Sequence, residues 1–159
     1  MKAASVVEIK QELKNNSSSQ LIDLCLRLAR FKKENKELLT YLLFEAHDEQ
    51  AFIAAVKMEI DDSFAQLPHT NAYLTKKSLR KILRTTNKYN RYIASKTAEV
   101  ELLMHYCIKL KSSGLLRRLG TAVKNLYMQQ LKKIEAAIGT LHEDLQYDYR
   151  KEMNFLQAV

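Results

Sequence analysis

The chain has 159 residues, a formal net charge of +8 at pH 7, three glycines, one proline and no tryptophan. Hydrophobic residues make up 47% of the sequence and charged residues 28%, which is typical of one ordinary globular domain. β-Sandwiches and doubly wound α/β folds draw on Gly and Pro for their many tight turns. Because both are scarce here, the composition argues against these fold classes and predicts an all-α protein.

Four short helices are expected in the first half of the chain. Ser5 and Glu8 have the spacing of a capping box, which predicts a helix start. Asp48 is a candidate N-cap for the fourth helix, and Pro68 ends it. Apolar residues at helical spacing set the extent of each helix. The predicted helices cover residues 6–14, 20–31, 34–46 and 48–67.

Two long helices are expected in the second half. No Pro or Gly occurs between Leu74 and Gly114, and apolar residues recur in steps of four and three. This spacing is that of a coiled-coil-like seam and predicts a single helix over about 76–111. After the break at Gly114, a last helix should run over about 115–155. The two long helices are predicted to form an antiparallel hairpin on which the four short helices pack, as in a bundle.

This arrangement predicts a short-helix N-terminal subdomain over 1–68 and a long helical hairpin over 75–159, together forming one globular domain. Residues 102–110 are apolar on most sides of the helix, whereas 76–91 has one apolar and one polar face. A helix that is apolar all round is buried all round. The short helices should therefore pack on the 100–110 end and leave 76–91 more exposed.

The positive charge is concentrated in the middle of the chain. Residues 63–134 carry 15 basic and 2 acidic side chains, against 9 and 11 in residues 1–62 and 2 and 5 in residues 135–159. Six basic residues lie on one face of the predicted long helix, and we call this set the basic ridge. It consists of Lys77, Arg80, Lys81, Arg84, Lys88 and Arg91.

The basic ridge has no acidic neighbour on its own helix, because no Asp or Glu occurs from Ser63 to Ala98. Like charges at this spacing destabilise a helix by about a few tenths of a kcal/mol each. Three interpretations are open: a solvated face, an acidic protein surface, or phosphate groups of nucleic acid or another polyanion. The acidic surface can belong to the same protein or to a second copy, since two acidic clusters occur. They comprise Glu45, Asp48, Glu49, Glu59, Asp61 and Asp62, and Glu143, Asp144, Asp148 and Glu152.

Further residues bear on the phosphate interpretation. If the ridge binds phosphate, three more cations are expected to extend it, and three tyrosines near it could stack on bases or pack within the bundle. No helix-turn-helix, zinc-finger or RNA-recognition signature is present, so base-specific recognition has no support. The cations are Arg117, Arg118 and Lys124, and the tyrosines are Tyr73, Tyr89 and Tyr92.

Catalytic and metal-binding motifs are absent from the sequence. No histidine has the Glu-x-x-His spacing of di-iron bundles, and no HxxxH, HExxH, GxSxG or glycine-rich phosphate loop occurs. Glu101, His105 and Lys109 are interpreted as a surface polar ladder. Cys25 and Cys107 are expected to be two small buried hydrophobes without a disulfide or metal. We therefore expect no catalytic residue, no metal site, no cofactor and no enzymatic activity.

Compartment and membrane signals are also lacking. Charged residues interrupt the first 14 positions, so no secretory signal is visible. The longest apolar runs are about a third of the ~20 residues that span a bilayer. The expected location is cytoplasmic, without membrane insertion.

Three N-terminal stretches resemble a known type of protein. Residues 7–10, 18–24 and 33–39 read VEIK, SSQLIDL and KENKELL, and this first quarter of the chain resembles a domain-of-unknown-function family of small bacterial all-helical proteins. The resemblance implies a bacterial, cytosolic, helical protein and carries over no site. The first functional hypothesis is accordingly a non-catalytic protein-interaction or scaffold protein, with a protein partner or self-association. The alternative is sequence-nonspecific binding of nucleic acid or another polyanion through the basic ridge.

Overall fold

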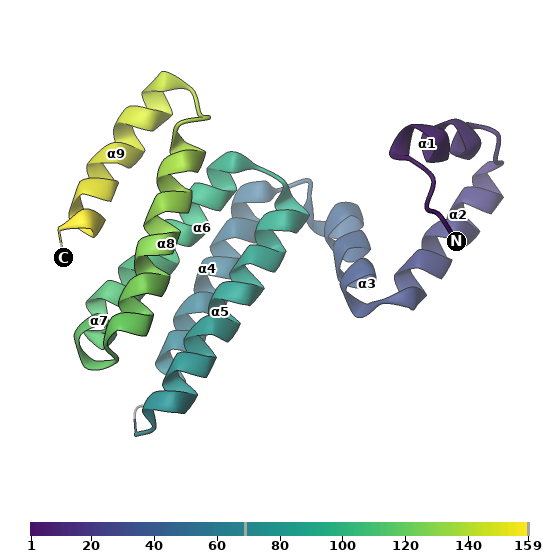
Figure 1. The fold of residues 1–159 in the computed structure, drawn as a ribbon. Helices are drawn as coiled ribbons and strands as arrows, with labels where there is room; N and C mark the ends of the chain where they lie inside the picture. The colour runs from purple at the N-terminus through teal and green to yellow at the C-terminus, as the bar shows by residue number, and fades with distance from the viewer. Residues whose placement is uncertain (69, 159) are drawn as a thin grey trace. The chain divides into compact units, whose positions relative to one another are not determined.

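A computed structural model describes residues 1–68 and 70–158. All regular elements in these residues are helical, which confirms the all-α prediction (Figure 1). Contacts divide the chain into two compact units, Met1–Glu45 and Ala46–Val159. We call the first the N-terminal unit and the second the bundle.

The N-terminal unit consists of short capped helices. A capping box starts the first helix, because the Ser5 N–H donates to Glu8 Oε2 at 2.7 Å and the Glu8 N–H donates to Ser5 Oγ at 3.3 Å. A second box, formed by Ser17 and Gln20, starts the next helix two residues before the predicted position. The elements are α1 (Val6–Lys14), α2 (Ser18–Phe31), α3 (Lys33–Thr40) and the π-helical turn η1 (Tyr41–Glu45).

The N-terminal unit has almost no core of its own. None of the described residues in α1, α2 or α3 is buried, although α2 and α3 pack on each other. Cys25 on α2 is exposed, so the expectation that both cysteines are buried is wrong for Cys25 and right for Cys107. The reason is that the apolar stripe of α2 packs on the short α3, and Cys25 lines the groove that remains between these two helices.

The bundle places α4 with the later helices. The side chain of Asp48 caps α4 by accepting from the Ala51 N–H at 3.0 Å, as predicted. Because α4 packs on α5 and α6, the division of the chain falls before α4 and not in the predicted interval 68–75. The bundle comprises α4 (Glu49–Ala65), α5 (Ala72–Ile93), α6 (Lys96–Ser112), α7 (Leu115–Arg118), α8 (Thr121–Ile138) and α9 (Glu143–Gln157).

The predicted single helix over 76–111 is wrong, because the chain reverses direction between α5 and α6 (Figure 1). Ala94 has a left-handed backbone with φ 55° and ends α5, and its N–H donates to the Asn90 carbonyl oxygen at 2.9 Å. Ser95 then caps α6 by accepting from the Ala98 N–H at 3.3 Å. The reversal lets α5 and α6 bury their apolar faces against one another, which a straight helix cannot do.

The predicted helix over 115–155 is also wrong, because the structure divides this segment into α7, α8 and α9. Gly120 precedes α8 with φ 74° and ψ −161°, a backbone conformation that is essentially restricted to glycine. A second turn follows Gly139, and the His142 ring caps α9 by accepting from the Asp144 N–H at 3.4 Å. The two-helix hairpin is thus replaced by shorter antiparallel helices.

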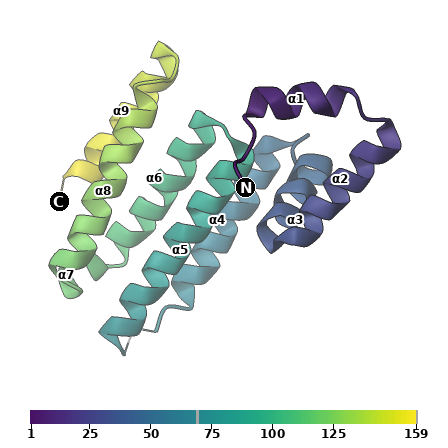
Figure 2. The same ribbon diagram turned by 45° about the vertical axis from the view of Figure 1, so that its right-hand side comes forward.

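Helix α6 lies at the centre of the bundle, in contact with α4, α5, α8 and α9 (Figures 1 and 2). Six of the nine residues in its segment 102–110 are buried and the other three are half-buried, which confirms the predicted burial of this segment. Of the four short helices expected to cover it, the contacts show α4, together with α5, α8 and α9. The buried hydroxyls are satisfied: Tyr106 donates to the Leu79 carbonyl oxygen at 3.2 Å, and Tyr127 donates to that of Leu156 at 2.9 Å. Within the described residues, no helix is long and apolar enough to cross a membrane.

Candidate functional site

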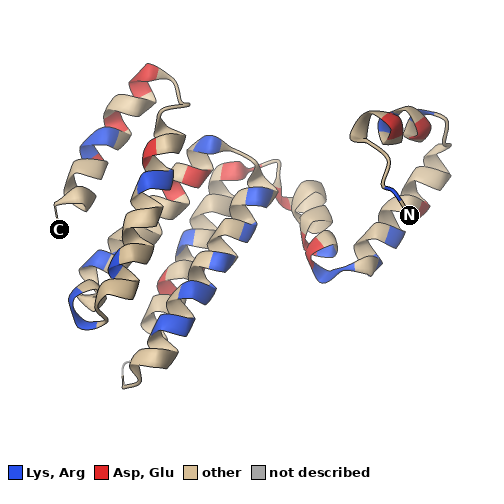
Figure 3. Cartoon of the chain, viewed as in Figure 1, with Lys and Arg blue, Asp and Glu red and all other residues tan. Residues whose placement is uncertain are grey.

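The basic ridge lies on the outer face of α5. Leu79, Ile82 and Leu83 are buried on the opposite face, where α5 contacts α4 and α6. The helical period therefore turns the six cations away from the core. Figure 3 shows the blue bands following one another along α5. Lys88 is half-buried, and the exposed members are Lys77, Arg80, Lys81, Arg84 and Arg91.

The exposed ridge cations have no acidic partner in the described part of the chain. None of the ion pairs or hydrogen bonds between described residues involves these five side chains. Two of the four acidic residues of α4 contact other groups: Glu59 accepts from the Tyr89 hydroxyl at 3.0 Å, and Asp61 contacts His105 and Lys109. The acidic cluster on α4 therefore leaves this face of α5 open.

Aromatic rings pack beside one end of the ridge. The Tyr89 ring lies edge-to-face against Phe52, with centroids 5.7 Å apart, and against Tyr92, with centroids 6.1 Å apart. The Lys88 ammonium lies 4.8 Å from the centroid of the Tyr89 ring. Tyr92 is buried within the bundle, whereas Tyr73 at the start of α5 is exposed. Of the three tyrosines noted in the sequence, Tyr92 is therefore the one buried by packing within the bundle, and Tyr89 is half-buried.

The three cations expected to extend the ridge lie elsewhere on the bundle. Arg117 and Arg118 are on α7, Lys124 is on the first turns of α8, and all three are exposed. Because α6 packs on both α5 and α8 and lies between them in both ribbon views, these cations belong to a different part of the surface. The structure therefore brings together the six cations of α5 and does not add the other three.

A cleft of about 260 Å³ runs between α4 and α5 beside the ridge. Its lining combines buried aliphatic side chains with hydroxyl, amide and charged groups. Lys81 belongs both to this cleft and to the basic ridge. The remaining lining residues are Val56, Glu59, Ile60, Ser63, Gln66, Ser78, Ile82, Thr85, Thr86 and Tyr89.

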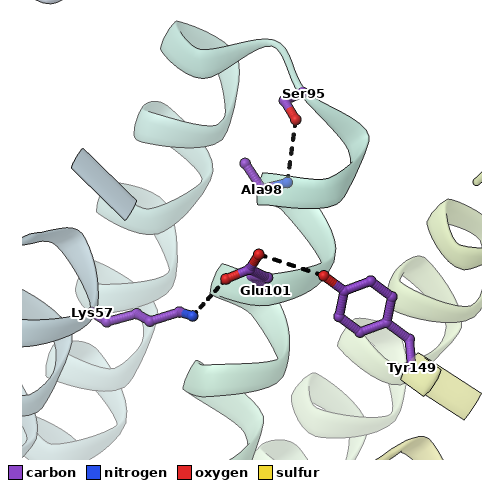
Figure 4. A network of polar contacts seen from close by, with 5 residues as sticks. All are labelled: Lys57, Ser95, Ala98, Glu101 and Tyr149. Carbon is purple, nitrogen blue, oxygen red and sulfur yellow. Dashed lines mark hydrogen bonds and ion pairs between the residues drawn. The ribbon is translucent and has the colours of Figure 1, made fainter. Parts of the chain in front are cut away.

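The predicted polar ladder of α6 is paired with neighbouring helices (Figure 4). The Lys57 ammonium lies 2.6 Å from Glu101 Oε2, and the Tyr149 hydroxyl donates to Glu101 Oε1 at 3.4 Å. Burial and the negative charge of Glu101 raise the pKa of Tyr149 to about 12. One helical turn along, His105 and Lys109 contact Asp61. Since these groups are engaged between helices, the ladder connects α4, α6 and α9.

The described residues include potential metal ligands and a buried thiol. No group of three or more His, Cys, Asp or Glu side chains is placed to hold a metal ion within residues 1–68 and 70–158. Cys107 is buried, which raises the pKa of its thiol to about 12. A protonated, inaccessible thiol is a packing group and not a nucleophile.

Comparisons with known proteins give no match: no protein-family model fits the chain, and neither curated proteins nor solved structures show similarity to it. Two features of the site were not predicted from the sequence, namely the α4–α5 cleft and the packing of Phe52 on Tyr89. Both depend on which helix lies beside α5, and the periodicity of one helix carries no such information.

Proposed function

We propose that this chain is a non-catalytic binding protein that holds polyanions, above all nucleic acid, on the basic ridge. The observation that supports this proposal is the open row of cations on α5, of which five are exposed and lack an acidic partner in the described part of the chain. Cations stacked on one helix face repel each other. An anion with repeated charges removes that repulsion and releases its own counterions on binding.

The length of the ridge suits several phosphates. From Lys77 to Arg91 the helix rises by about 21 Å at 1.5 Å per residue. One strand of a duplex carries a phosphate about every 3.4 Å along its axis, so roughly six phosphates can lie beside the ridge. The ridge cations are long, flexible side chains that can contact phosphates through their positive charge. Contacts to phosphates carry no sequence information, so this favours sequence-independent binding.

Fluorescence anisotropy with labelled duplex DNA, single-stranded DNA and RNA tests this proposal. Four or five phosphate contacts predict that the affinity falls by roughly two to three orders of magnitude between about 50 and 200 mM salt. The double charge reversal Lys77→Glu, Arg84→Glu should remove most of the binding at low salt.

A matched control exists on the same bundle. The double reversal Arg117→Glu, Arg118→Glu changes the net charge by the same amount, but these residues lie on α7, outside the ridge. Binding should survive in this control. Failure of the unmodified protein to bind at low salt, or equal loss in both variants, would contradict the proposal.

A second candidate function is self-association through the N-terminal unit, and a specific observation favours it. An apolar groove of about 320 Å³ lies between α2 and α3, lined by Cys25, Leu28, Ala29, Asn35, Leu38, Leu39 and Leu42. Large apolar side chains are also exposed on α2 and η1, which both contribute residues to the groove. They are Ile22, Leu24, Leu26, Leu28, Phe31, Leu42, Leu43 and Phe44. Extensive exposed apolar surface of this kind is typical of an interaction site.

The exposed apolar area of α2 and η1 is large enough to supply an interface with a second copy of the chain. At the observed exposures the eight side chains expose on the order of 100 Å² each, or roughly 800 Å² together, and each partner of a standard interface contributes about 800 Å². Two identical units can bury the same patch on both sides of a two-fold axis. We therefore propose a dimer formed by the groove regions of two copies.

Light scattering coupled to size exclusion tests the dimer over a series of micromolar concentrations. Leu28→Arg places a charge in the groove and should give a monomer. Met58→Arg is the control, because Met58 is equally exposed but lies on α4 of the bundle. A monomeric unmodified protein at the highest concentration, or a Leu28→Arg variant that still dimerises, would overturn this candidate.

A further inference from the structure

The cleft between α4 and α5 adjoins the basic ridge, so a ligand on the ridge has access to it. Lys81 is exposed on the ridge and also lines the cleft. The ridge member Arg84 comes directly before Thr85, another lining residue. A nucleotide whose phosphate lies on the ridge can therefore direct its other end between the two helices.

The lining of the cleft has the chemistry of a site for a flat heterocycle. Val56, Ile60 and Ile82 are buried and form an aliphatic floor. The rim carries neutral groups that both donate and accept hydrogen bonds. These are Ser63, Gln66, Ser78 and Thr85. An apolar floor with a few convergent polar groups is the usual form of a small-molecule site, and a nucleobase has apolar faces and polar edges.

One wall of the cleft is held in place by its neighbours. The Tyr89 hydroxyl donates to Glu59 Oε2 at 3.0 Å, and both residues line the cleft. On its other sides the Tyr89 ring contacts Phe52 and Tyr92 edge-to-face, with interplanar angles of 87° and 72°. Aromatic side chains in single-strand binding sites bind bases by stacking, which is tolerant of sequence.

The charged residues that line the cleft favour different positions for the base and the phosphate of a nucleotide. The Glu59 carboxylate repels a phosphate inside the cleft and can accept a hydrogen bond from an exocyclic amino group of a base. Lys81 lies where the cleft meets the ridge and attracts phosphate. This polarity orients a nucleotide with its base inward and its phosphate outward.

We propose that the cleft accepts one unpaired base of a single-stranded nucleic acid whose phosphates lie on the basic ridge. This inference rests on the proposed function and restricts the preferred ligand to single strands. The bases of a duplex are stacked and paired, so a base must be extruded before it can reach a cleft. Single strands are therefore the preferred partner over duplexes with the same number of phosphates.

The test compares an ordinary single-stranded DNA with an abasic strand of the same length and phosphate number, using anisotropy at low salt. The ordinary strand should bind about tenfold more tightly, as expected for one base in an aromatic-walled site. Ser78→Leu fills the cleft without changing the charge and should abolish this difference. Gln66→Met, which keeps the size of the side chain but removes its amide, should reduce it.

Two controls separate the cleft from the ridge. Asn125→Leu makes a polar-to-leucine change similar to Ser78→Leu at an exposed position of α8, and it should leave the difference intact. Lys77→Glu, Arg84→Glu should weaken binding of both strands equally. Circular dichroism and thermal melting establish that each variant is folded.

The outcomes are distinguishable. Equal affinity of the unmodified protein for the ordinary and abasic strands, or an unchanged difference in folded Ser78→Leu and Gln66→Met, overturns the cleft inference and leaves the ridge function standing. No binding of either strand overturns both. Tighter binding of duplex than of single strand also overturns the cleft inference.

Discussion

The Nε2 atom of His105 on α6 lies 2.6 Å from Oδ1 of Asp61 on α4, and this contact joins two helices of the bundle that are separated in the sequence by the whole of α5. Lys109 Nζ lies 3.1 Å from the other carboxylate oxygen. Burial is the largest single influence on Asp61 and raises its pKa. The hydrogen bonds and positive charges of His105 and Lys109 together outweigh it and lower the pKa of Asp61 below its usual value.

The first prediction concerns the pH dependence of stability. A carboxyl group whose pKa is lowered by folding stabilises the protein above its unfolded pKa of about 3.9 and loses this contribution as pH falls through the folded pKa. Asp61→Asn should therefore reduce the free energy of unfolding at pH 7 by at most about 1 kcal/mol, since the pair is partly exposed. Denaturant titrations should show the difference from the unmodified protein shrinking below about pH 4. A difference that is constant with pH would contradict the assignment.

The second prediction concerns Lys57 and Glu101. Only 19% of the Glu101 side chain is exposed. Lys57→Met therefore leaves a carboxylate between helices whose remaining hydrogen bond, among the described residues, is to the Tyr149 hydroxyl. We expect a loss of about 1–2 kcal/mol in the free energy of unfolding, between the values for exposed and buried pairs. Adding Glu101→Gln removes the unpaired charge and should restore part of that loss. A double variant less stable than Lys57→Met would argue against this account.

The third prediction compares two glycines with positive φ. Gly114 has φ 71° and ψ 1°, in the left-handed helical region, whereas Gly120 has φ 74° and ψ −161°. Among the described residues, a Cβ at either position would meet no atom within 4 Å beyond the adjoining backbone, so the cost of alanine is backbone strain alone. Gly114→Ala should lower the free energy of unfolding by about 1–2 kcal/mol, and Gly120→Ala by about 1–3 kcal/mol. Thermal melts should therefore rank Gly120→Ala as the less stable variant, and the reverse order would contradict it.

The sequence and the structure agree where the signal is local. The Ser5–Glu8 capping box and the Asp48 cap involve residues three apart, and their hydrogen bonds form as predicted. The helical period likewise places the basic ridge on one face of α5. The break at Ala94 has no such local signal, because alanine favours helix and adopts φ 55° only where the surrounding fold imposes it. That break depends on the apolar faces of α5 and α6 meeting in the folded bundle.

Gly120 and Gly139 are sequence signals for the helix ends on either side of α8. The helical spacing of the leucines and isoleucines nevertheless continues past both glycines. Periodicity alone therefore joined α7, α8 and α9 into one predicted helix. The cleft is harder to predict from the sequence than the helix breaks. Its two walls come from α4 and α5, and the alignment of these helices is set by their packing. The six ridge cations could be predicted as a set, whereas the cavity beside them could not.

The fourth prediction contrasts a core position with a surface position of the bundle. Leu103 on α6 is fully buried, and Met58 on α4 is 68% exposed. Leu103→Ala should lower the free energy of unfolding by about 2–5 kcal/mol through lost burial and a residual cavity. Met58→Ala should change it by less than about 0.5 kcal/mol. Urea titration of both variants checks the contrast, and similar values would mean that α6 is not at the centre of the core.

The fifth prediction concerns thiol reactivity. Cys25 is exposed, whereas Cys107 is buried with its pKa raised to about 12. The thiolate is the reactive form, so a thiol-specific reagent near pH 8 should modify Cys25 in the native protein and leave Cys107 unmodified. Denaturant should make Cys107 react as well. Mass spectrometry of the labelled peptides identifies the site, and native labelling of Cys107 would contradict its burial.

The reversal at Ala94 has a consequence for how the bundle folds. It makes α5 and α6 neighbours both in sequence and in space, and α4 with α5 and α8 with α9 are paired in the same way. Short connections bring such pairs together with little loss of chain entropy. Helical proteins dominated by local contacts fold within about microseconds to milliseconds. The bundle should therefore reach its native pairing soon after α9 has been synthesised, with little time for exposed apolar faces to aggregate.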